Sequence, residues 1–105
     1  GWCYNDAERY NDAVQVLQQS IQLDSDNAEA YNELGYAFHQ LRRYSEAVSH
    51  YQMAIQKKPD YGLAYYNLGI TYKALGNRNG AMEQYRALQR IDAKRAQKLL
   101  TALNN

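Results

Sequence analysis

The chain has 105 residues, of which 46% are hydrophobic and 22% charged, and its net charge is +1. So small a net charge gives no general positive field, which argues against a nucleic-acid partner held by phosphate neutralisation. The single cysteine, Cys3, excludes an internal disulfide. No apolar run approaches the roughly 20 residues that span a bilayer, so we expect no membrane insertion. We expect one small soluble domain, cytoplasmic by default because nothing in the sequence names a compartment.

The N-terminal segment, residues 1–26, is predicted to form an incomplete pair of helices. Residues 1–8 look like the end of a helix, and residues 9–13 look like a turn in which Asn11 caps the next helix. That helix is expected over residues 11–23. Its apolar stripe consists of Val14, Leu17 and Ile21. Because the chain starts without an initiator methionine, we expect it to be a fragment of a longer protein.

The middle of the chain predicts two amphipathic helices joined by a tight turn. The first is expected over residues 27–41 with Asp26 or Asn27 as its cap, and the second over residues 45–57 with Ser45 as its cap. Apolar residues recur every three or four positions in both helices, which marks the face that must be buried. These are Ala30, Tyr31, Leu34, Ala37, Phe38 and Leu41, then Ala47, Val48, Tyr51, Ala54 and Ile55.

The last part of the chain predicts three more helices, over residues 61–75, 79–91 and 93–103. Gly76 can take the left-handed conformation that ends a helix, and Asp92 can cap the last one. The last helix has leucines on one side and basic side chains on the other. A one-sided terminal helix of this kind typically closes the end of a stack of repeats.

One pattern recurs with a period of about 34 residues, which is typical of a helical solenoid. The first helix of each copy carries aromatic, Leu-Gly and aromatic residues, and the second carries Ala followed by Tyr. In the middle copy these are Tyr31, Leu34, Gly35, Phe38, Ala47 and Tyr51; in the last copy they are Tyr65, Leu68, Gly69, Tyr72, Ala81 and Tyr85. The two glycines are expected to let neighbouring helices approach closely.

This pattern resembles the tetratricopeptide repeat (TPR). The middle copy also matches at Ala54 and Pro59, whereas the last copy departs from the pattern at Leu88 and Ala93. The resemblance implies an all-α fold, a right-handed superhelical solenoid of antiparallel helix hairpins with a C-terminal capping helix. We expect a single domain over residues 1–105. It would consist of a truncated repeat (1–26), two repeats (27–60 and 61–92) and a capping helix (93–105).

The resemblance also implies a function, because the concave groove of this family, lined by first helices, binds peptides or extended segments of partner proteins. We therefore expect a protein–protein interaction scaffold. The first-helix side chains that packing does not use should line the groove. These are Trp2, Asn5, Asp6, Glu29, Asn32, Glu33, Tyr36, His39, Gln40, Leu63, Tyr66, Asn67, Ile70 and Lys73.

The kind of partner depends on which residues stand in the groove. One mode of the family is a clamp of lysine, asparagine and arginine around carboxylates. The matching positions here are Glu33, Leu63 and Asn67, so the required cations are missing and we do not expect this clamp. Trp2, Tyr36, Tyr66 and Ile70 instead suggest apolar anchors. The alternative is that Tyr36 and Tyr66 pack against the neighbouring repeat without binding a partner.

A second hypothesis is self-assembly into homo-oligomers through the ends of the solenoid. Residues 1–46 carry eight acids and three bases, whereas residues 47–105 carry three acids and nine bases, which favours head-to-tail contact. No acid, base and nucleophile converge in the pattern, so we expect no enzyme and no cofactor. His39 and His50 lie on different predicted helices without further ligands at zinc spacing, so we expect no metal site.

Overall fold

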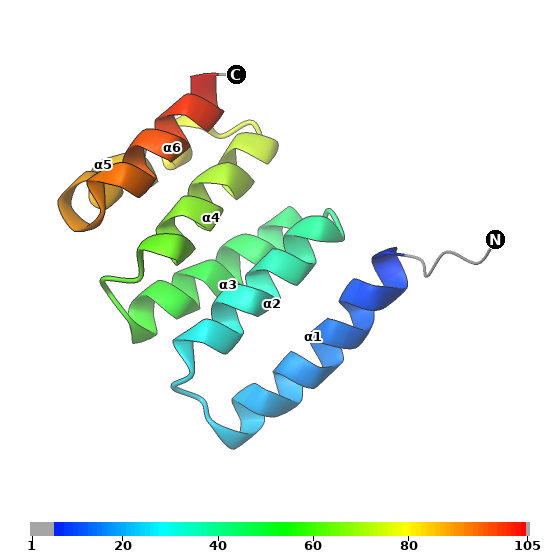
Figure 1. Cartoon of the computed structure of the whole chain (residues 1–105). Helices are drawn as coiled ribbons and strands as arrows, with labels where there is room; N and C mark the ends of the chain where they lie inside the picture. The colour runs from blue at the N-terminus through cyan, green and yellow to red at the C-terminus, as the bar shows by residue number, and fades with distance from the viewer. Residues whose placement is uncertain (1–5, 105) are drawn as a thin grey trace.

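The computed structural model describes residues 6–104, with side chains from Glu8 onward. Two predicted groove residues, Trp2 and Asn5, and the side chain of Asp6 lie outside this description. Residues 6–104 form six helices and no strand (Figure 1). The helices are α1 (Asp6–Leu23), α2 (Ala28–Gln40), α3 (Tyr44–Lys57), α4 (Gly62–Ala74), α5 (Arg78–Ile91) and α6 (Ala93–Asn104). None of these helices is long and apolar enough to cross a membrane.

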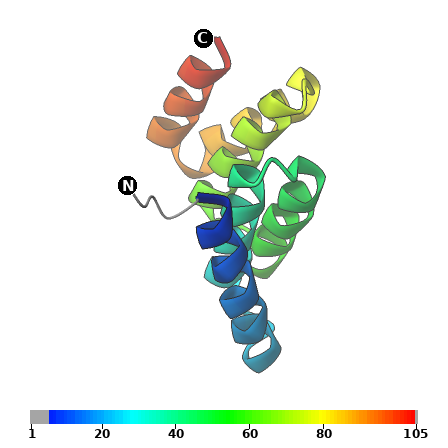
Figure 2. The ribbon, with the colours of Figure 1, turned by 90° about the vertical axis from the view of Figure 1, so that its right-hand side faces the viewer.

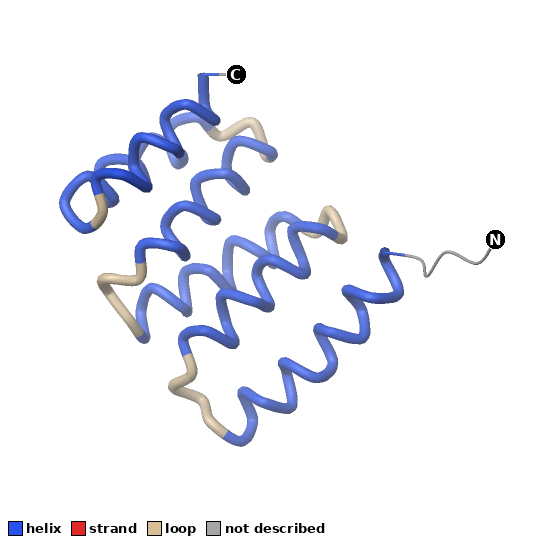
Figure 3. The backbone as a smooth tube through the Cα atoms, viewed as in Figure 1, coloured by secondary structure: helices blue, strands red, loops and turns tan. Residues whose placement is uncertain are grey.

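Consecutive helices pack against one another to give an all-α solenoid. The pairs α2–α3 and α4–α5 are the two hairpins, α1 packs on α2, and α6 closes the other end against α5 and α4. Short loops join the helices (Figure 3), and the stack runs from α1 at one end to α6 at the other (Figure 2). The predicted fold class is confirmed.

The buried side chains are those at the recurring positions of the sequence pattern. In the first hairpin Leu34, Phe38 and Tyr51 are at most 2% exposed, and Ala47 is fully buried between them. Burial of one such side chain stabilises the fold by about 1.5–3 kcal/mol, so these positions hold the helices together. A second core joins α5 and α6 and consists of Ala81, Leu88, Ala96, Leu99 and Leu103.

Three helix starts are capped by side chains. The Oδ1 atoms of Asn27, Asn77 and Asp92 each accept a hydrogen bond from a backbone N–H three residues later, over 2.9–3.2 Å. This confirms Asn27 and Asp92 as caps. Ser45 was the wrong choice for α3, because this helix begins one residue earlier, at Tyr44.

The turn expected over residues 9–13, with Asn11 as a cap, is wrong: α1 is continuous from Asp6 to Leu23. Glu8, Arg42 and Gly76 occupy equivalent positions, one repeat period apart. Arg42 and Gly76 follow the ends of α2 and α4 and have positive φ angles of 64° and 78°. A left-handed conformation costs a non-glycine residue roughly 1–2 kcal/mol. Among residues 6–104 no preceding helix packs on α1 to offset that cost, so the helix-forming segment before Asn11 continues the helix.

Both signature glycines allow close approach, but to different helices. A Cβ added at Gly35 would lie 2.6 Å from ring atoms of Tyr51 in the paired helix α3. At Gly69 it would lie 2.8 Å from Leu99, which belongs to α6. The second glycine therefore accommodates the closing helix.

Candidate functional site

Two neighbouring cavities open on the side of the solenoid lined by α2 and α4. The larger, of about 380 Å³, lies between α1, α2 and α4. The smaller, of about 190 Å³, lies between α2 and α4. They share Tyr36 and Asn67, so they form one groove, which we call the α2–α4 groove. The larger cavity is lined by Tyr10, Ala13, Leu17, Asn32, Glu33, Tyr36, Ala37, Leu63 and Asn67; the smaller adds His39, Gln40, Tyr51, Tyr66 and Ile70.

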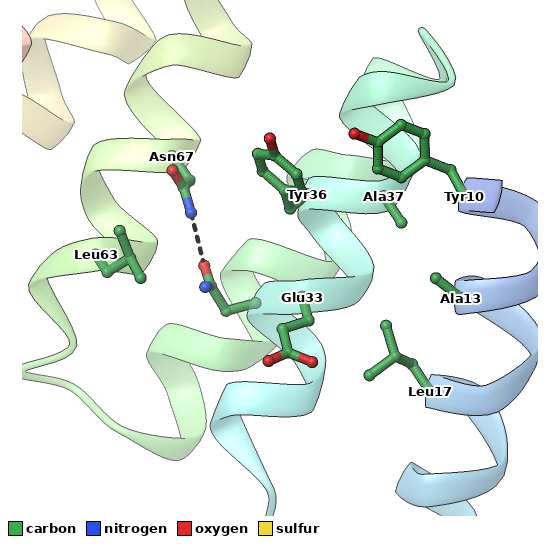
Figure 4. Close-up of a pocket in the computed structure, with 9 residues that line it drawn as sticks. Tyr10, Ala13, Leu17, Glu33, Tyr36, Ala37, Leu63 and Asn67 are labelled. Atoms are coloured by element: carbon green, nitrogen blue, oxygen red, sulfur yellow. Dashed lines mark hydrogen bonds between the residues drawn. The ribbon is translucent and has the colours of Figure 1, made fainter. Parts of the chain in front are cut away.

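The walls of the larger cavity are mainly apolar. Figure 4 shows Tyr10, Ala13 and Leu17 projecting from α1 toward α2, with Leu63 on the far side. Tyr36 meets Tyr10 edge to face, with ring centroids 6.2 Å apart, yet remains 47% exposed. Tyr36 therefore both packs against a neighbouring helix and presents a large apolar surface to the groove.

An amide pair forms the polar floor of the groove. The Asn67 Nδ2 atom donates a hydrogen bond to Asn32 Oδ1 over 3.1 Å (Figure 4). Asn32 is only 5% exposed, so this bond satisfies an amide that burial would otherwise penalise. The pair ties α2 to α4 and keeps both side chains in fixed positions.

His39 is held by a similar contact at the smaller cavity. Its Nδ1 lies 2.9 Å from Thr71 Oγ1, and the Thr71 hydroxyl donates to the backbone oxygen of Asn67, also over 2.9 Å. Since the only hydroxyl proton is already used, His39 Nδ1 carries a proton and donates to Thr71. Burial lowers the pKa of His39, which favours the neutral ring.

Charge changes sign along the groove. Glu33 lines the larger cavity, whereas Arg95 and Lys98 line a further cavity of about 210 Å³ with Leu63 and Tyr66. Burial raises the pKa of Tyr61; the charges of Glu29 and Glu33 act in the same direction, and a hydrogen bond to Asn32 and the charge of Arg95 oppose them. The α2–α4 groove thus has an acidic side chain at its α1 end, and a neighbouring cavity toward α6 has two basic ones.

Most of the groove residues chosen from the sequence meet at these cavities, and two do not. Asn32, Glu33, Tyr36, His39, Gln40, Leu63, Tyr66, Asn67 and Ile70 line the α2–α4 groove. Glu29 lines a separate polar hollow, and Lys73 donates a hydrogen bond to the backbone oxygen of Ala102 in α6 over 2.5 Å.

The sequence choice missed the side of the groove that α1 supplies, namely Tyr10, Ala13 and Leu17. Ala37 also borders the larger cavity, but it is 2% exposed, as expected for the buried face. The sequence did contain a sign of the missed α1 side. Ala13 and Leu17 stand one repeat before Ala47 and Tyr51, which are buried because a preceding helix covers them.

Solved structures of several repeat proteins share this fold. MamA is 32% identical to the chain with a TM-score of 0.82; the match covers 90% of this chain and 56% of MamA, so the chain spans about half its length. The TPR2B domain of yeast Sti1, in its complex with pHsp70, is 21% identical with a TM-score of 0.85, covering 92% and 84% of the two chains. The Arabidopsis OM64 TPR domain is 21% identical with a TM-score of 0.84, covering 92% and 82%.

Family models give the same result from the sequence. The TPR repeat model matches residues 3–42 and 36–76, and the tetratricopeptide repeat model matches residues 63–95. No curated protein matches the chain. With the helix pairs, the recurring packing residues and these matches together, the chain belongs to the tetratricopeptide repeat family.

Proposed function

We propose that this chain is a protein-interaction module that binds an extended segment of a partner protein in the α2–α4 groove. The observation that carries the proposal is the half-exposed Tyr36 at the junction of two apolar cavities. Aromatic side chains lose little entropy on binding and supply much of the energy of peptide interfaces. Tyr66 and Ile70 line the next stretch of the groove and would hold a second anchor.

The change of charge along the groove gives the bound segment a direction. Glu33 favours basic side chains of the partner at the α1 end, and Arg95 and Lys98 favour acidic ones at the α6 end. The Sti1 relative is solved in a complex with pHsp70. A carboxylate clamp is not proposed here, because Glu33 and Leu63 stand at two of its three positions and line the larger cavity.

The test is selection of binding peptides from a random library displayed on phage, followed by affinity measurements on the purified chain. The double variant Tyr36→Ala, Tyr66→Ala should lower the affinity for the selected peptides by more than about tenfold, the scale of one lost aromatic anchor. The control is Val16→Ala, since Val16 is 65% exposed and lines neither cavity. Equal affinity for the double variant and the control would refute the groove assignment.

Self-association is the second candidate function, and the separation of charge between the two halves of the chain favours it. The outer face of α6 carries Lys94, Gln97, Lys98 and Thr101, all exposed. Contact through this polar face would be electrostatic and therefore weakened by salt. Light scattering over a range of protein and salt concentrations tests it: a monomer at every concentration in low salt would exclude end-to-end assembly.

A further inference from the structure

His39 carries a hydrogen-bond acceptor that the fold does not use. It stands in the last turn of α2, and its ring lines the smaller cavity. Because Nδ1 donates to Thr71 Oγ1 over 2.9 Å, Nε2 of the neutral ring has a lone pair and no proton. Among residues 6–104 Nε2 has no hydrogen-bond partner, and no buried side-chain nitrogen there lacks one. Nε2 is therefore accessible from outside the protein.

Neighbouring side chains hold the His39 ring in one position and one tautomer. Thr71 is fully buried, and its hydroxyl donates to the backbone oxygen of Asn67 over 2.9 Å, which leaves its oxygen to accept from His39. From α3, the Tyr44 ring meets the His39 ring edge to face, with centroids 5.1 Å apart. A group that is already fixed loses less conformational entropy on binding than a mobile one. Nε2 is thus an acceptor whose position is set before a ligand arrives.

No charged side chain of the described residues lines the smaller cavity. Its other lining residues are Tyr36, Gln40, Tyr51, Tyr66, Asn67 and Ile70. The charged groups of the neighbouring elements are engaged or lie elsewhere: Glu33 of α2 lines the larger cavity, Arg42 is exposed, Arg43 pairs with Glu46 of α3, and Lys73 of α4 bonds to Ala102. From α1, Tyr10 meets Tyr36. His39 is therefore the lining residue of a type that ordinarily titrates between pH 5 and 8.

The ligand group that matches Nε2 is an N–H donor. An extended segment carries backbone N–H groups, each of which needs an acceptor once the groove removes its water. The neutral imidazole supplies that acceptor without a charge. When the ring is protonated, Nε2 becomes a second donor and the ring becomes positive. The same N–H group of the ligand would then face a proton in place of a lone pair, so its hydrogen bond would be lost.

From these observations we infer that neutral His39 accepts a hydrogen bond from an N–H group of the segment bound in the α2–α4 groove, with Thr71 as its positioning residue, and that protonation of His39 weakens binding. This inference rests on the proposed function and deepens it, since it names one specificity-determining contact and its regulation. Burial lowers the pKa of His39 below its usual 6.5. Binding should therefore be complete near pH 7.5 and decline as the pH falls below 6.5 through the folded pKa.

The tautomer of His39 can be measured in the free chain, without any peptide. Nitrogen-15 NMR at about pH 8 should show the proton on Nδ1, and comparison with His39→Gln assigns the signals. Thr71→Ser keeps a hydroxyl and should keep this tautomer, whereas Thr71→Val removes the acceptor and should lose the preference. A proton on Nε2 in the parent chain would overturn the inference, even if the groove binds peptides.

The binding test uses histidine-free peptides that are selected on the chain at about pH 7.5. Their affinity for the parent chain, followed by fluorescence anisotropy, should fall by about threefold to tenfold between pH 7.5 and 5.0, the scale of one hydrogen bond. His39→Gln should abolish this dependence. His50→Gln is the matched control and should keep it, because His50 lies in α3, contacts the backbone oxygen of Glu46 and lines neither cavity. A flat profile in the parent chain, tighter binding in acid, or an unchanged profile in His39→Gln would overturn the inference.

Thr71 provides a second perturbation that leaves His39 in place. Thr71→Val should lower the affinity at pH 7.5 by about threefold or more, and Thr71→Ser should restore it. Equal affinity of a folded Thr71→Val variant and the parent chain would overturn the inference. Peptides that bind the parent chain and the double variant Tyr36→Ala, Tyr66→Ala equally would refute the proposed function and this inference with it. Peptides that lose affinity in that double variant but show no effect of His39 would refute this inference alone.

Changes in the peptide identify the donor. Ester replacement of each backbone amide tests a main-chain N–H group, and alanine replacement of each donor side chain tests a side-chain one. At one position the change should weaken binding to the parent chain several-fold and have little effect on His39→Gln, because the two groups form one hydrogen bond. An ester effect would assign the backbone and an alanine effect the side chain. No coupling at any position would overturn the inference.

Discussion

Gly35→Ala tests the packing at the centre of the first hairpin. The added Cβ would lie 2.6 Å from Cδ1 and Cε1 of Tyr51 and 3.0 Å from its Cγ. Tyr51 is 1% exposed and belongs to the core of the first hairpin, so any shift of its ring disturbs buried neighbours. Overpacking of a filled core costs about 1–3 kcal/mol, and so large an overlap belongs at the upper end. Alanine returns roughly 1 kcal/mol of helix propensity, which leaves a net loss of about 2 kcal/mol.

Thermal and urea unfolding followed by circular dichroism measure this loss. For a domain of this size about 2 kcal/mol corresponds to a fall in Tm of roughly 8–16 °C. Gly69→Ala should cost less, because the atoms it meets at 2.8–2.9 Å are the terminal methyls of Leu99. Gly62→Ala is the control with room, since its nearest neighbours lie at 3.5 Å, and it should be neutral or stabilising.

A double-mutant cycle shows whether the contact with Tyr51 is the cause. Tyr51→Leu introduces the residue that stands at the equivalent position 17 and removes the ring. In that background Gly35→Ala should cost far less than in the parent chain, giving a coupling energy of about 1–2 kcal/mol. A Gly35→Ala variant as stable as the parent, or an equal loss in both backgrounds, would refute the packing argument.

Three smaller effects on stability are expected: from loss of a helix cap, from substitution at a positive φ angle, and from titration of a histidine. Asn77→Ala removes the side chain that accepts from Gly80 N–H and should cost about 1 kcal/mol in urea unfolding. Gly76→Ala meets no steric contact but keeps φ at 78°, so it should cost about 1 kcal/mol in the same assay. Burial lowers the pKa of folded His39 below its unfolded value, so the unfolded chain binds more protons and stability falls with acidification from pH 6.5 toward the folded pKa. His39→Gln should flatten this part of the Tm–pH profile; an unchanged slope would contradict the assignment.

The helix positions could be predicted because one local pattern specifies them. Apolar spacing placed the ends of α2 to α6 within one residue, and Asn27 and Asp92 were recognisable caps. The start of α1 could not be predicted in the same way. Residues 9–13 have the residue types found at the corresponding turn of the other repeats. Whether the chain turns there depends on tertiary packing against a preceding helix, which local sequence does not encode.

The residues that line the cavities could be predicted only by one rule: first-helix positions that are not used for packing face the groove. Tyr36, Asn67 and Ile70 followed from that rule. Lys73 did not, because its long side chain reaches the end of α6, a contact that no periodicity encodes. Asn32 lies at the groove as expected, but its side-chain oxygen accepts a hydrogen bond from Asn67. The sequence therefore predicted where this residue lies and did not predict that its amide already has a partner.

The role of a repeat position therefore depends on what covers it. Ala47 and Ala13 are the same residue at the same place in the repeat frame, but α2 buries the first completely and the second lies at an open cavity. The apolar surface that one hairpin buries is therefore left partly exposed at the α1 end of the described residues. A position that the signature assigns to folding can thus be buried in one repeat and line a cavity in another, as Ala47 and Ala13 show.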